Sequence, residues 1–450
     1  MEIEQESAPR SGFAPTLPAT LDAGSKVIAE YIWLGGSGTD LRSLAKVLET
    51  APTRLEHLPD WHVDGSCSGL ALPDDYYVYL KPQAYYPDPF RGGQNVLVLC
   101  GTYVYKEASN SGQASDLLPH ATNNRFPCKR VMELASTSQP TFSVDQEYTI
   151  TNPSTSWIVS SSVGSIPVQG APSFCGTGSG VVSGREVSES FLVACLHAGL
   201  KISTSSALAC RGQWVYHLGP CEGIAMADEL WVSRYVLLRS AEIHRLNVTF
   251  DPEPVPSNNL QPLCCSVEFS TNETRTPETG IEVIATHIEA LKENHIRHVV
   301  AYGKGYLQRL SIPHQDVLRQ RCREFTSGYG NKATSIMIPH STRMRRCGHY
   351  IDQRPASNMD PYLVTALLVS TTLGVPLRAA AGENIAGVGG GSEYGLGGGG
   401  DVEDGDLDDE DAGVWEEAFI NEIAMHEPMI PDTPPLSRCF TSCLTQKTFA

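Results

Sequence analysis

Two stretches near the start of the chain are rich in β-branched and aromatic residues and are bounded by Gly and Pro. They are residues 27–34 and 95–100. Short apolar runs with turn-forming residues on both sides predict β-strands. Residues 101–125 are polar and rich in turn formers, which predicts a linker. We therefore expect a small, mostly β domain at 26–100, preceded by a flexible arm at 1–25.

Between residues 126 and 379 two kinds of pattern alternate. Residues 184–199 and 278–294 read as helices, whereas 231–238 and 335–339 are β-rich runs. No internal repeat of fixed period is evident. This mixture predicts a second domain at 126–379 in which a sheet packs with helices, and an α+β fold class for the chain.

The pattern ends after residue 379. Gly dominates residues 387–400, and residues 401–411 hold eight acidic residues in eleven. Such a sequence cannot bury enough apolar area to offset the entropy of ordering, so 380–450 is expected to be a disordered Gly-rich and acidic tail. Within it, Trp415, Phe419 and Ile423 recur at four-residue spacing and predict a short helix at 414–425. Its apolar stripe would dock either in a partner's groove or on this protein's own surface.

Charge is distributed unevenly over the 450 residues. The formal net charge is −18, of which residues 382–450 carry −13 and the remainder −5. An acidic surface repels phosphate backbones, which argues against nucleic acid as a partner. Residues 1–20 do not read as a signal peptide, and no apolar run approaches the roughly 20 residues of a membrane-spanning helix. The expectation is a cytoplasmic protein with no membrane partner.

The thirteen cysteines show no repeated pair spacing, which favours free thiols packed as small hydrophobes. Cys264 with Cys265, and Cys439 with Cys443, could bind metal or oxidise, but each lacks a second pair at zinc-site spacing. His295 and His298 are interpreted as surface or core histidines. Any metal chemistry therefore has to lie elsewhere.

Longer strings of residues carry a more specific signal. In chain order they are Ala-Glu-Tyr-Ile-Trp-Leu from Ala29, Leu-Pro-Asp-Trp-His-Val-Asp-Gly-Ser from Leu58, Asp-Pro-Phe-Arg from Asp88, Cys-Lys-Arg-Val-Met-Glu from Cys128, Asp-Gln-Glu-Tyr-Thr from Asp145, Leu-Gly-Pro-Cys-Glu-Gly-Ile from Leu218, Thr-Phe-Asp-Pro-Glu-Pro-Val-Pro from Thr249, Asn-Lys-Ala-Thr-Ser-Ile from Asn331 and Asn-Met-Asp-Pro from Asn358. With these strings in this order, residues 26–373 resemble the glutamine synthetases of the eukaryotic type.

The resemblance implies an N-terminal β-grasp domain followed by a catalytic-type domain whose curved antiparallel sheet is flanked by helices. Members of this family assemble as two stacked pentameric rings, and each active site forms between the N-terminal domain of one subunit and the catalytic domain of its neighbour. They join ammonia to glutamate with ATP and with Mg or Mn. The resemblance therefore implies these cofactors and, as partners, further copies of the chain or an active synthetase paralogue.

Alignment on the flanking strings locates the family's metal-binding positions in this chain. Two carboxylates remain, at Asp145, which is shortened from Glu, and Glu147, whereas the other three fall on Leu208, Val215 and Ile351, and the metal-binding histidine falls within 265–266. Apolar side chains offer a divalent cation no lone pair, so weak metal binding is expected.

One alternative keeps the metal site. A neighbouring carboxylate, Glu222 or Glu268, would replace a missing ligand, which we expect to need a rearranged backbone.

The phosphate- and substrate-binding arginines follow the same trend. Their positions fall on Lys332, Met337 and Gln353, with only Arg354 unchanged. Together with Ser270, Lys332 and Arg354 are the candidate remnants of a nucleotide or phosphate site. Removal of one preorganised electrostatic group commonly costs about 100- to 1000-fold in rate, so synthetase activity is predicted to be lost or very weak.

Asp64 is a retained position of a different kind. It matches the family aspartate that helps to bind ammonium and that serves the neighbouring subunit's site. The alternative is that Asp64 only closes a turn before Gly65.

Three hypotheses remain open at this point. The first is an inactive homologue that acts through assembly, in other words a pseudoenzyme. The second is a weak glutamate–ammonia ligase, or a ligase for a related amide, in which Asp145, Glu147, Lys332 and Arg354 hold one metal and a phosphate. The third is a regulatory subunit that donates Asp64 to an active synthetase in mixed rings. The acidic tail adds a candidate binding segment for a further protein partner.

Overall fold

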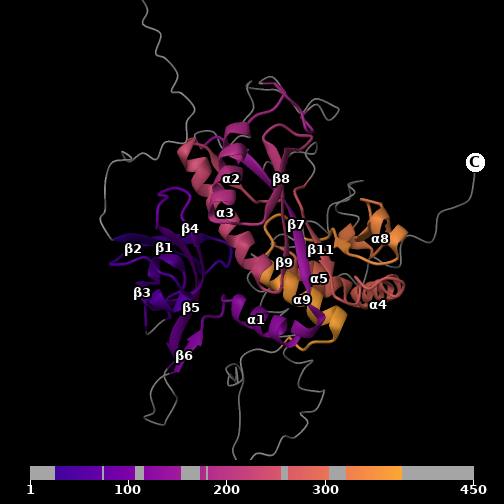
Figure 1. The fold of residues 1–450 in the computed structure, drawn as a ribbon, viewed down its shortest axis with the longest axis horizontal. Helices are drawn as coiled ribbons and strands as arrows, with labels where there is room; N and C mark the ends of the chain where they lie inside the picture. The colour runs from indigo at the N-terminus through magenta and orange to yellow at the C-terminus, as the bar shows by residue number, and fades with distance from the viewer. Residues whose placement is uncertain are drawn as a thin grey trace, which may run out of the picture.

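The structure is a computed structural model that describes residues 26–72, 75–106, 116–153, 173–178, 181–254, 262–303 and 321–377. Within these ranges the chain has the predicted α+β fold, with two β-sheets and helices packed against the second (Figure 1). The arm at 1–25, the tail at 380–450 with its predicted helix at 414–425, and Cys439 and Cys443 lie outside the described residues.

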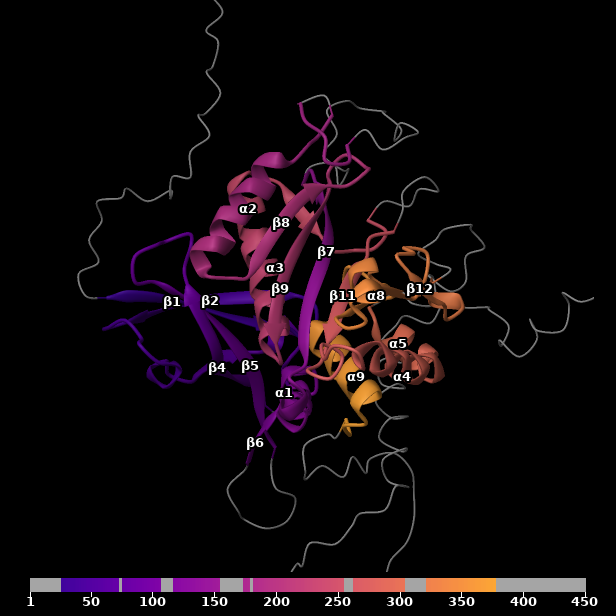
Figure 2. The same cartoon turned by 45° about the vertical axis from the view of Figure 1, so that its right-hand side comes forward.

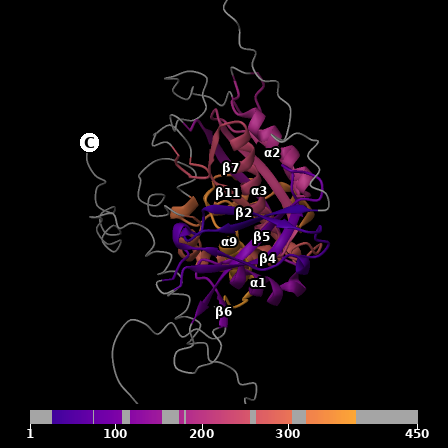
Figure 3. The ribbon, with the colours of Figure 1, turned by 90° about the vertical axis from the view of Figure 1, so that its left-hand side faces the viewer.

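The first sheet has six strands in the order β2-β1-β5-β4-β3, and β6 pairs with β5. The strands are β1 (Val27–Leu34), β2 (Leu41–Leu48), β3 (Trp61–Asp64), β4 (Tyr77–Pro87), β5 (Val96–Lys106) and β6 (Asp116–Pro119). A core around Tyr31, Leu80 and Val98 fills one face of this sheet. Figure 3 views the molecule from the side of this sheet, with β2, β4 and β5 in front of α3 and β7.

The expected linker at 101–125 needs correction. β5 continues to Lys106 and β6 pairs with it, so the sheet extends beyond the boundary expected at residue 100. Beyond Cys100 the strand alternates between buried Thr102 and Val104 and more exposed Tyr103 and Tyr105. Beyond Cys100, buried and more exposed side chains alternate instead of forming a continuous apolar run. The sequence therefore reads as polar although the strand continues.

The second sheet has eight strands in the order β12-β13-β14-β11-β7-β9-β8, and β10 pairs with β7. The strands are β7 (Thr141–Thr151), β8 (Ile202–Ala207), β9 (Gln213–Glu222), β10 (Asn247–Thr249), β11 (Cys265–Ser270), β12 (Ser327–Tyr329), β13 (Ile336–Ile338) and β14 (Tyr350–Asp352). In Figure 2, α2 and α3 lie beside β8 and β9, whereas α4, α5 and α9 lie toward β11. β7 is central, because β9, β10 and β11 all pair with it.

The helices confirm one part of the sequence prediction and contradict another. They are α1 (Arg125–Leu134), α2 (Arg185–Ala198), α3 (Ala225–Ile243), α4 (Gly280–Glu293), α5 (His295–Ala301), α8 (His340–Arg345) and α9 (Pro361–Leu373). The helices predicted at 184–199 and 278–294 are α2 and α4, and the strand predicted at 335–339 is β13. Among the helices of the described ranges, none combines the length and apolar character needed to cross a bilayer.

The strand predicted at 231–238 is wrong, because these residues lie within α3. Residues 226–237 of α3 are buried on all sides, as Trp231, Val232, Tyr235 and Val236 show. A helix without a solvent face has no apolar and polar period, so its sequence cannot be distinguished from that of a buried strand.

Buried histidines make the stability of this fold sensitive to acid. Burial lowers the pKa of His120, His287, His295 and His298, and that of His287 falls to about 4. A lowered pKa in the folded state means that the unfolded state binds the proton more readily. The stabilising contribution of neutral His287 is therefore complete above pH 6.5 and is lost as the pH falls from 6.5 to about 4.

We accordingly expect His287→Gln to flatten the pH dependence of the free energy of unfolding by about 3 kcal/mol between pH 6.5 and 4. Denaturant titrations at stepped pH measure this difference. Thr286→Gln, at an exposed position of the same helix, is the control and should retain the original slope. A parallel shift of the whole curve, with no change of slope, would contradict the prediction.

Candidate functional site

Alternation along β7 separates a core face from a second face. Val144, Gln146 and Tyr148 are fully buried in the core, whereas Asp145 and Glu147 point the other way and are only half-buried. Successive side chains of a strand point to opposite faces of its sheet, so Asp145 and Glu147 share one face. We call this the β7 outer face, and with their neighbours in register its half-buried residues are Asp145, Glu147, Val215, His217, Ser266, Glu268 and Ile351.

Strand register places most of the aligned metal positions on the β7 outer face. Glu147 is opposite Val215 of β9, and Asp145 is opposite Ser266 of β11. On β14, Ile351 is opposite Glu268 of β11 and Met337 of β13. Leu208 directly follows β8, and its amide donates to the Gln213 carbonyl at 2.9 Å. The structure thus places Val215 beside the retained Glu147, whereas Ile351 lies beside Glu268, with β11 between it and β7.

Asp145 is engaged with a histidine. Nδ1 of His217, directly across on β9, lies 2.8 Å from Oδ1 of Asp145. The hydrogen bond to Asp145 and the negative charges of Asp145 and Glu268 raise the pKa of His217 against the opposing effect of burial. Asp145 therefore forms a hydrogen-bonded pair with His217.

Glu147 is engaged with the backbone. Its Oε2 accepts a hydrogen bond from the amide of Cys264 at 2.8 Å. Burial raises the pKa of Glu147, and the hydrogen bond from Cys264 opposes this shift. Glu147 is therefore held in place by a backbone donor.

Glu268 lies on the β7 outer face in regular strand register, opposite Ser143 and Ile351. Its Oε2 lies 3.8 Å from Nε2 of His349. Glu222 is exposed at the far end of β9, opposite Thr141. Of the two substitutes considered, Glu268 is the nearer to Asp145, because Glu222 is opposite Thr141, four residues along β7.

The donor set on this face does not fit a magnesium ion. In the part of the chain that the structure describes, no three His, Cys, Asp or Glu side chains are grouped so that they could hold a metal ion. Magnesium requires an octahedron of hard oxygen ligands, and Asp145, Glu147 and Glu268, the carboxylates of this face, do not form such a cluster. Val215, opposite Glu147, and Ile351, opposite Glu268, have hydrocarbon side chains and offer no ligand.

The candidate phosphate-site residues lie in different parts of the fold and differ in burial. Lys332 is exposed in the loop between β12 and β13. Nε2 of buried Gln353 donates to the carbonyl of Thr334 at 2.8 Å, at the end of this loop. Ser270 is buried at the end of β11, where its hydroxyl accepts a hydrogen bond from Arg275 at 3.0 Å.

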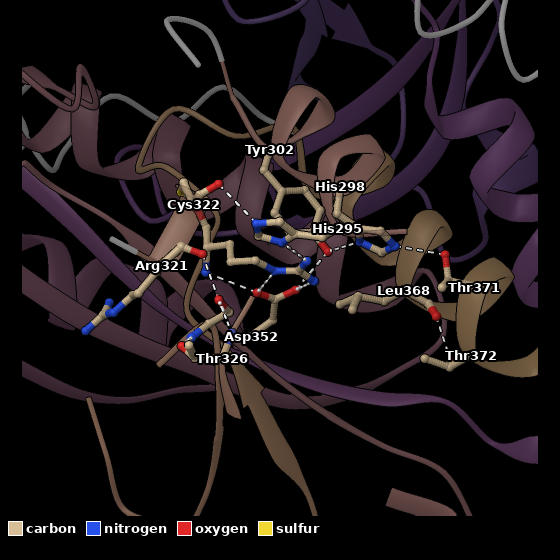
Figure 4. A network of polar contacts seen from close by, with 12 residues as sticks. His295, His298, Tyr302, Arg321, Cys322, Thr326, Asp352, Leu368, Thr371 and Thr372 are labelled. Carbon is tan, nitrogen blue, oxygen red and sulfur yellow. Dashed lines mark hydrogen bonds and ion pairs between the residues drawn. The ribbon is translucent and has the colours of Figure 1, made fainter. Parts of the chain in front are cut away.

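Arg354 belongs to a buried polar network. Its Nη2 donates to Oδ2 of Asp352 at 2.7 Å and its Nε donates to Oδ1 at 2.9 Å, and both side chains are fully buried. Tyr302 donates to the same carboxylate, and Figure 4 shows Tyr302, Asp352, His295 and His298 within one set of hydrogen bonds. The guanidinium is committed to an internal ion pair and does not reach the face that carries Asp145.

Asp64 is exposed at the end of β3, the edge strand of the first sheet. Its Oδ1 accepts a hydrogen bond from the Ser66 amide at 2.8 Å, and hydrogen bonds from the Ser66 side chain and amide lower the pKa of Asp64. Such a bond closes a turn before the short helix at Ser66–Ser68. The structure does not bring Asp64 together with Asp145 within one chain, since β3 lies on the far side of the first sheet (Figure 1).

Cys264 and Cys265, and the histidines His295 and His298, belong to the packing of the protein. All described cysteines are free thiols, including half-buried Cys264 and buried Cys265, as predicted. His295 and His298, interpreted from the sequence as surface or core histidines, are both buried.

Two histidines on or beside the β7 outer face were missed from the sequence. His217 and His349 approach carboxylates only because strands far apart in the chain pair in this register. For His217 a signal was present, because it alternates with buried Trp214, Tyr216 and Leu218 and must face away from the core.

Comparison with known proteins addresses the resemblance directly. A scan against models of known protein families finds no match. The chain is 40% identical over 357 residues to a glutamine synthetase cytosolic isozyme of Chlamydomonas reinhardtii, with 79% of this chain and 92% of the relative covered. This chain belongs to the glutamine synthetase family.

Other glutamine synthetases agree with this assignment. Root isozyme 3 of Zea mays is 38% identical over 355 residues, which cover 78% of this chain and 95% of the relative. A glutamine synthetase of Emericella nidulans is 38% identical over 356 residues, which cover 79% and 95%. The glutamine synthetase scaffold thus spans the described part of this chain, and the apolar positions on its β7 outer face lie within that scaffold.

Proposed function

We propose that this protein is a catalytically inactive or strongly impaired glutamine synthetase homologue that acts through assembly. One observation carries the proposal: on the β7 outer face the two retained carboxylates are bonded to His217 and to the Cys264 amide, and the position opposite Glu147 is Val215. The ATP and the Mg or Mn that the family implies would bind weakly or not at all, because no cluster of hard ligands is formed among the described residues.

The function is tested with the purified full-length chain. We expect no measurable conversion of glutamate and ammonia to glutamine at ordinary enzyme rates, and no heat of binding when MgATP is titrated at millimolar concentration. An active relative assayed in the same buffer is the control. Glutamine formation at tens of turnovers per second would refute the proposal.

A gain-of-function variant sharpens this test. Leu208→Glu, Val215→Glu and Ile351→Glu together restore the missing carboxylates, and calorimetry should then detect Mg²⁺ or Mn²⁺ binding that the unmodified chain lacks. The matched control replaces one Leu, one Val and one Ile at exposed positions on three other elements, as Leu196→Glu, Val47→Glu and Ile296→Glu. Equal metal binding by both triple variants would show that added charge alone, and not the face, determines affinity.

A second candidate function is regulation within mixed rings. Asp64 is exposed on an edge strand and remote from its own chain's β7 outer face, which favours a role at a neighbouring subunit. We infer assembly with further copies or with an active synthetase, in stacked pentameric rings as the family implies. Co-purification with an active synthetase, and activity that changes with the mixing ratio, would support this role.

The enzyme alternative is a weak glutamate–ammonia ligase or a ligase for a related amide. It would rely on Asp145, Glu147 and Glu268 for a single metal ion, and on Lys332 and Arg354 for phosphate. Detectable MgATP binding by the unmodified chain would favour it over the inactive homologue. We place the protein in the cytoplasm, since two of the relatives it matches are named cytosolic isozymes.

A further inference from the structure

A basic and aromatic cavity lies where α1 meets β4 and β5, away from the β7 outer face. Its volume is about 350 Å³, and Tyr103, Phe126, Lys129 and Arg130 are among its lining residues. Lys129 is exposed, and its Nζ lies 3.8 Å from the carboxylate of Glu133, which is also exposed and also lines the cavity; exposed pairs at this separation contribute little. The cavity therefore offers cationic groups that remain accessible to a further anion.

Apolar surface continues from this cavity on both sides. Tyr105, two residues beyond Tyr103 on β5, is 38% exposed, and Leu134 at the end of α1 is 54% exposed. Tyr105 stacks edge-on against Tyr79 of β4, with ring centroids 4.8 Å apart. A ligand that combines aromatic side chains with carboxylates would match this surface in both character and charge.

We propose that this α1 cavity is the docking site of the chain's own C-terminal segment 401–425. That segment has eight acidic residues in 401–411, followed by Trp415 and Phe419 one helical turn apart. An aromatic anchor in the cavity and carboxylates near Lys129 and Arg130 would satisfy both features at once. The inference concerns regulation or partner access and does not depend on the loss of catalysis.

The chain between α9 and segment 401–425 is long enough for the segment to reach the cavity. Leu377 follows α9, and α9 packs against α1, with the Thr365 hydroxyl 3.6 Å from the Cys128 thiol. α9 is about 20 Å long. The residues from 378 to 400 span at most about 80 Å when extended, so segment 401–425 reaches the cavity. Attachment to the same chain also raises its local concentration at the cavity.

A second basic surface on the molecule provides an internal comparison. α8 carries Arg343 and Arg345, the adjoining Met344 is 83% exposed, and Lys332 lies in the preceding loop. The α8 surface offers positive charge and one apolar side chain. The α1 cavity offers positive charge together with a hollow lined by aromatic residues. If charge alone attracted the tail, α8 would compete equally with α1.

The experiment is zero-length carbodiimide cross-linking of the full-length chain, read by mass spectrometry. We expect amide links from Lys129 to carboxylates of 401–425 to exceed those from Lys332 about fivefold or more, and to weaken as salt rises. Arg130→Glu, and separately Trp415→Ala with Phe419→Ala, should each reduce the Lys129 links about fivefold. Arg343→Glu with Arg345→Glu is the matched control and should leave them unchanged.

Three outcomes would overturn the proposal. The first is links that form mainly at Lys332, and the second is Lys129 links that survive both the Arg130 and the aromatic substitutions. The third comes from a mixture of isotopically labelled and unlabelled chains. Links between labelled and unlabelled chains would assign the cavity to the tail of a second copy, whereas links within one chain support the proposal.

Discussion

Replacement of Arg354 with methionine is expected to lower the free energy of unfolding by about 3–5 kcal/mol. Methionine retains much of the side-chain volume but leaves the Asp352 carboxylate buried without its cation. The Tyr302 hydroxyl and the backbone amide of residue 354 would remain as donors to Asp352, and two neutral hydrogen bonds do not compensate a buried charge. Chemical denaturation followed by circular dichroism measures the change.

The control for this prediction is Arg346→Met. The Arg346 side chain is 61% exposed and lies 3.8 Å from Glu282, so its loss should change stability by less than about 0.5 kcal/mol. An Arg354→Met chain of normal stability that had lost affinity for ATP would instead support the prediction that Arg354 is a remnant of the nucleotide site.

Arg125→Met should have an effect of similar size, at the junction of the two sheets. Arg125 donates through Nε and Nη2 to the two carboxylate oxygens of Asp228 on α3, each at 2.8 Å, and through Nη1 to Gln83 of β4 at 2.6 Å. The substitution leaves Asp228 with the hydroxyl of Tyr362 alone, at a cost of about 3–5 kcal/mol.

Hydrogen exchange distinguishes this variant from a merely destabilised protein. Loss of the Gln83 contact should increase exchange in β4 and β5 more than in β7 and β9, because Gln83 belongs to β4, whereas the other lost partner, Asp228, lies on α3 and not on a strand of the second sheet. Lys292→Met, at an exposed position of α4, is the control and should change neither stability nor exchange. Uniform acceleration in both sheets would show that Arg125 does not link the two sheets.

Much of the fold was predictable because several elements have a distinct pattern. α2 and α4 each present a buried and an exposed face, and β1 is a bounded apolar run. The prediction failed where this contrast was absent. Residues 226–237 of α3 are buried all round, so part of its sequence reads as a strand, and the second half of β5 carries tyrosines on its exposed side, so it reads as a linker.

The site was predictable in its positions but not in its contacts. Alignment of strings identified Asp145, Glu147, Val215 and Ile351, and strand register places them on one face. The partners of the retained carboxylates could not be predicted. The pairing of His217 with Asp145 joins residues 72 positions apart, and only the sheet specifies which of them meet.

The alternation along β7 has an evolutionary consequence. Val144, Gln146 and Tyr148 maintain the core, whereas Asp145 and Glu147 point away from it, so each set can mutate without disturbing the packing of the other. Ligands on the outer face can therefore be exchanged one at a time while the protein stays above its stability threshold. The same independence makes this face a suitable place to engineer a new binding site into an otherwise unchanged scaffold.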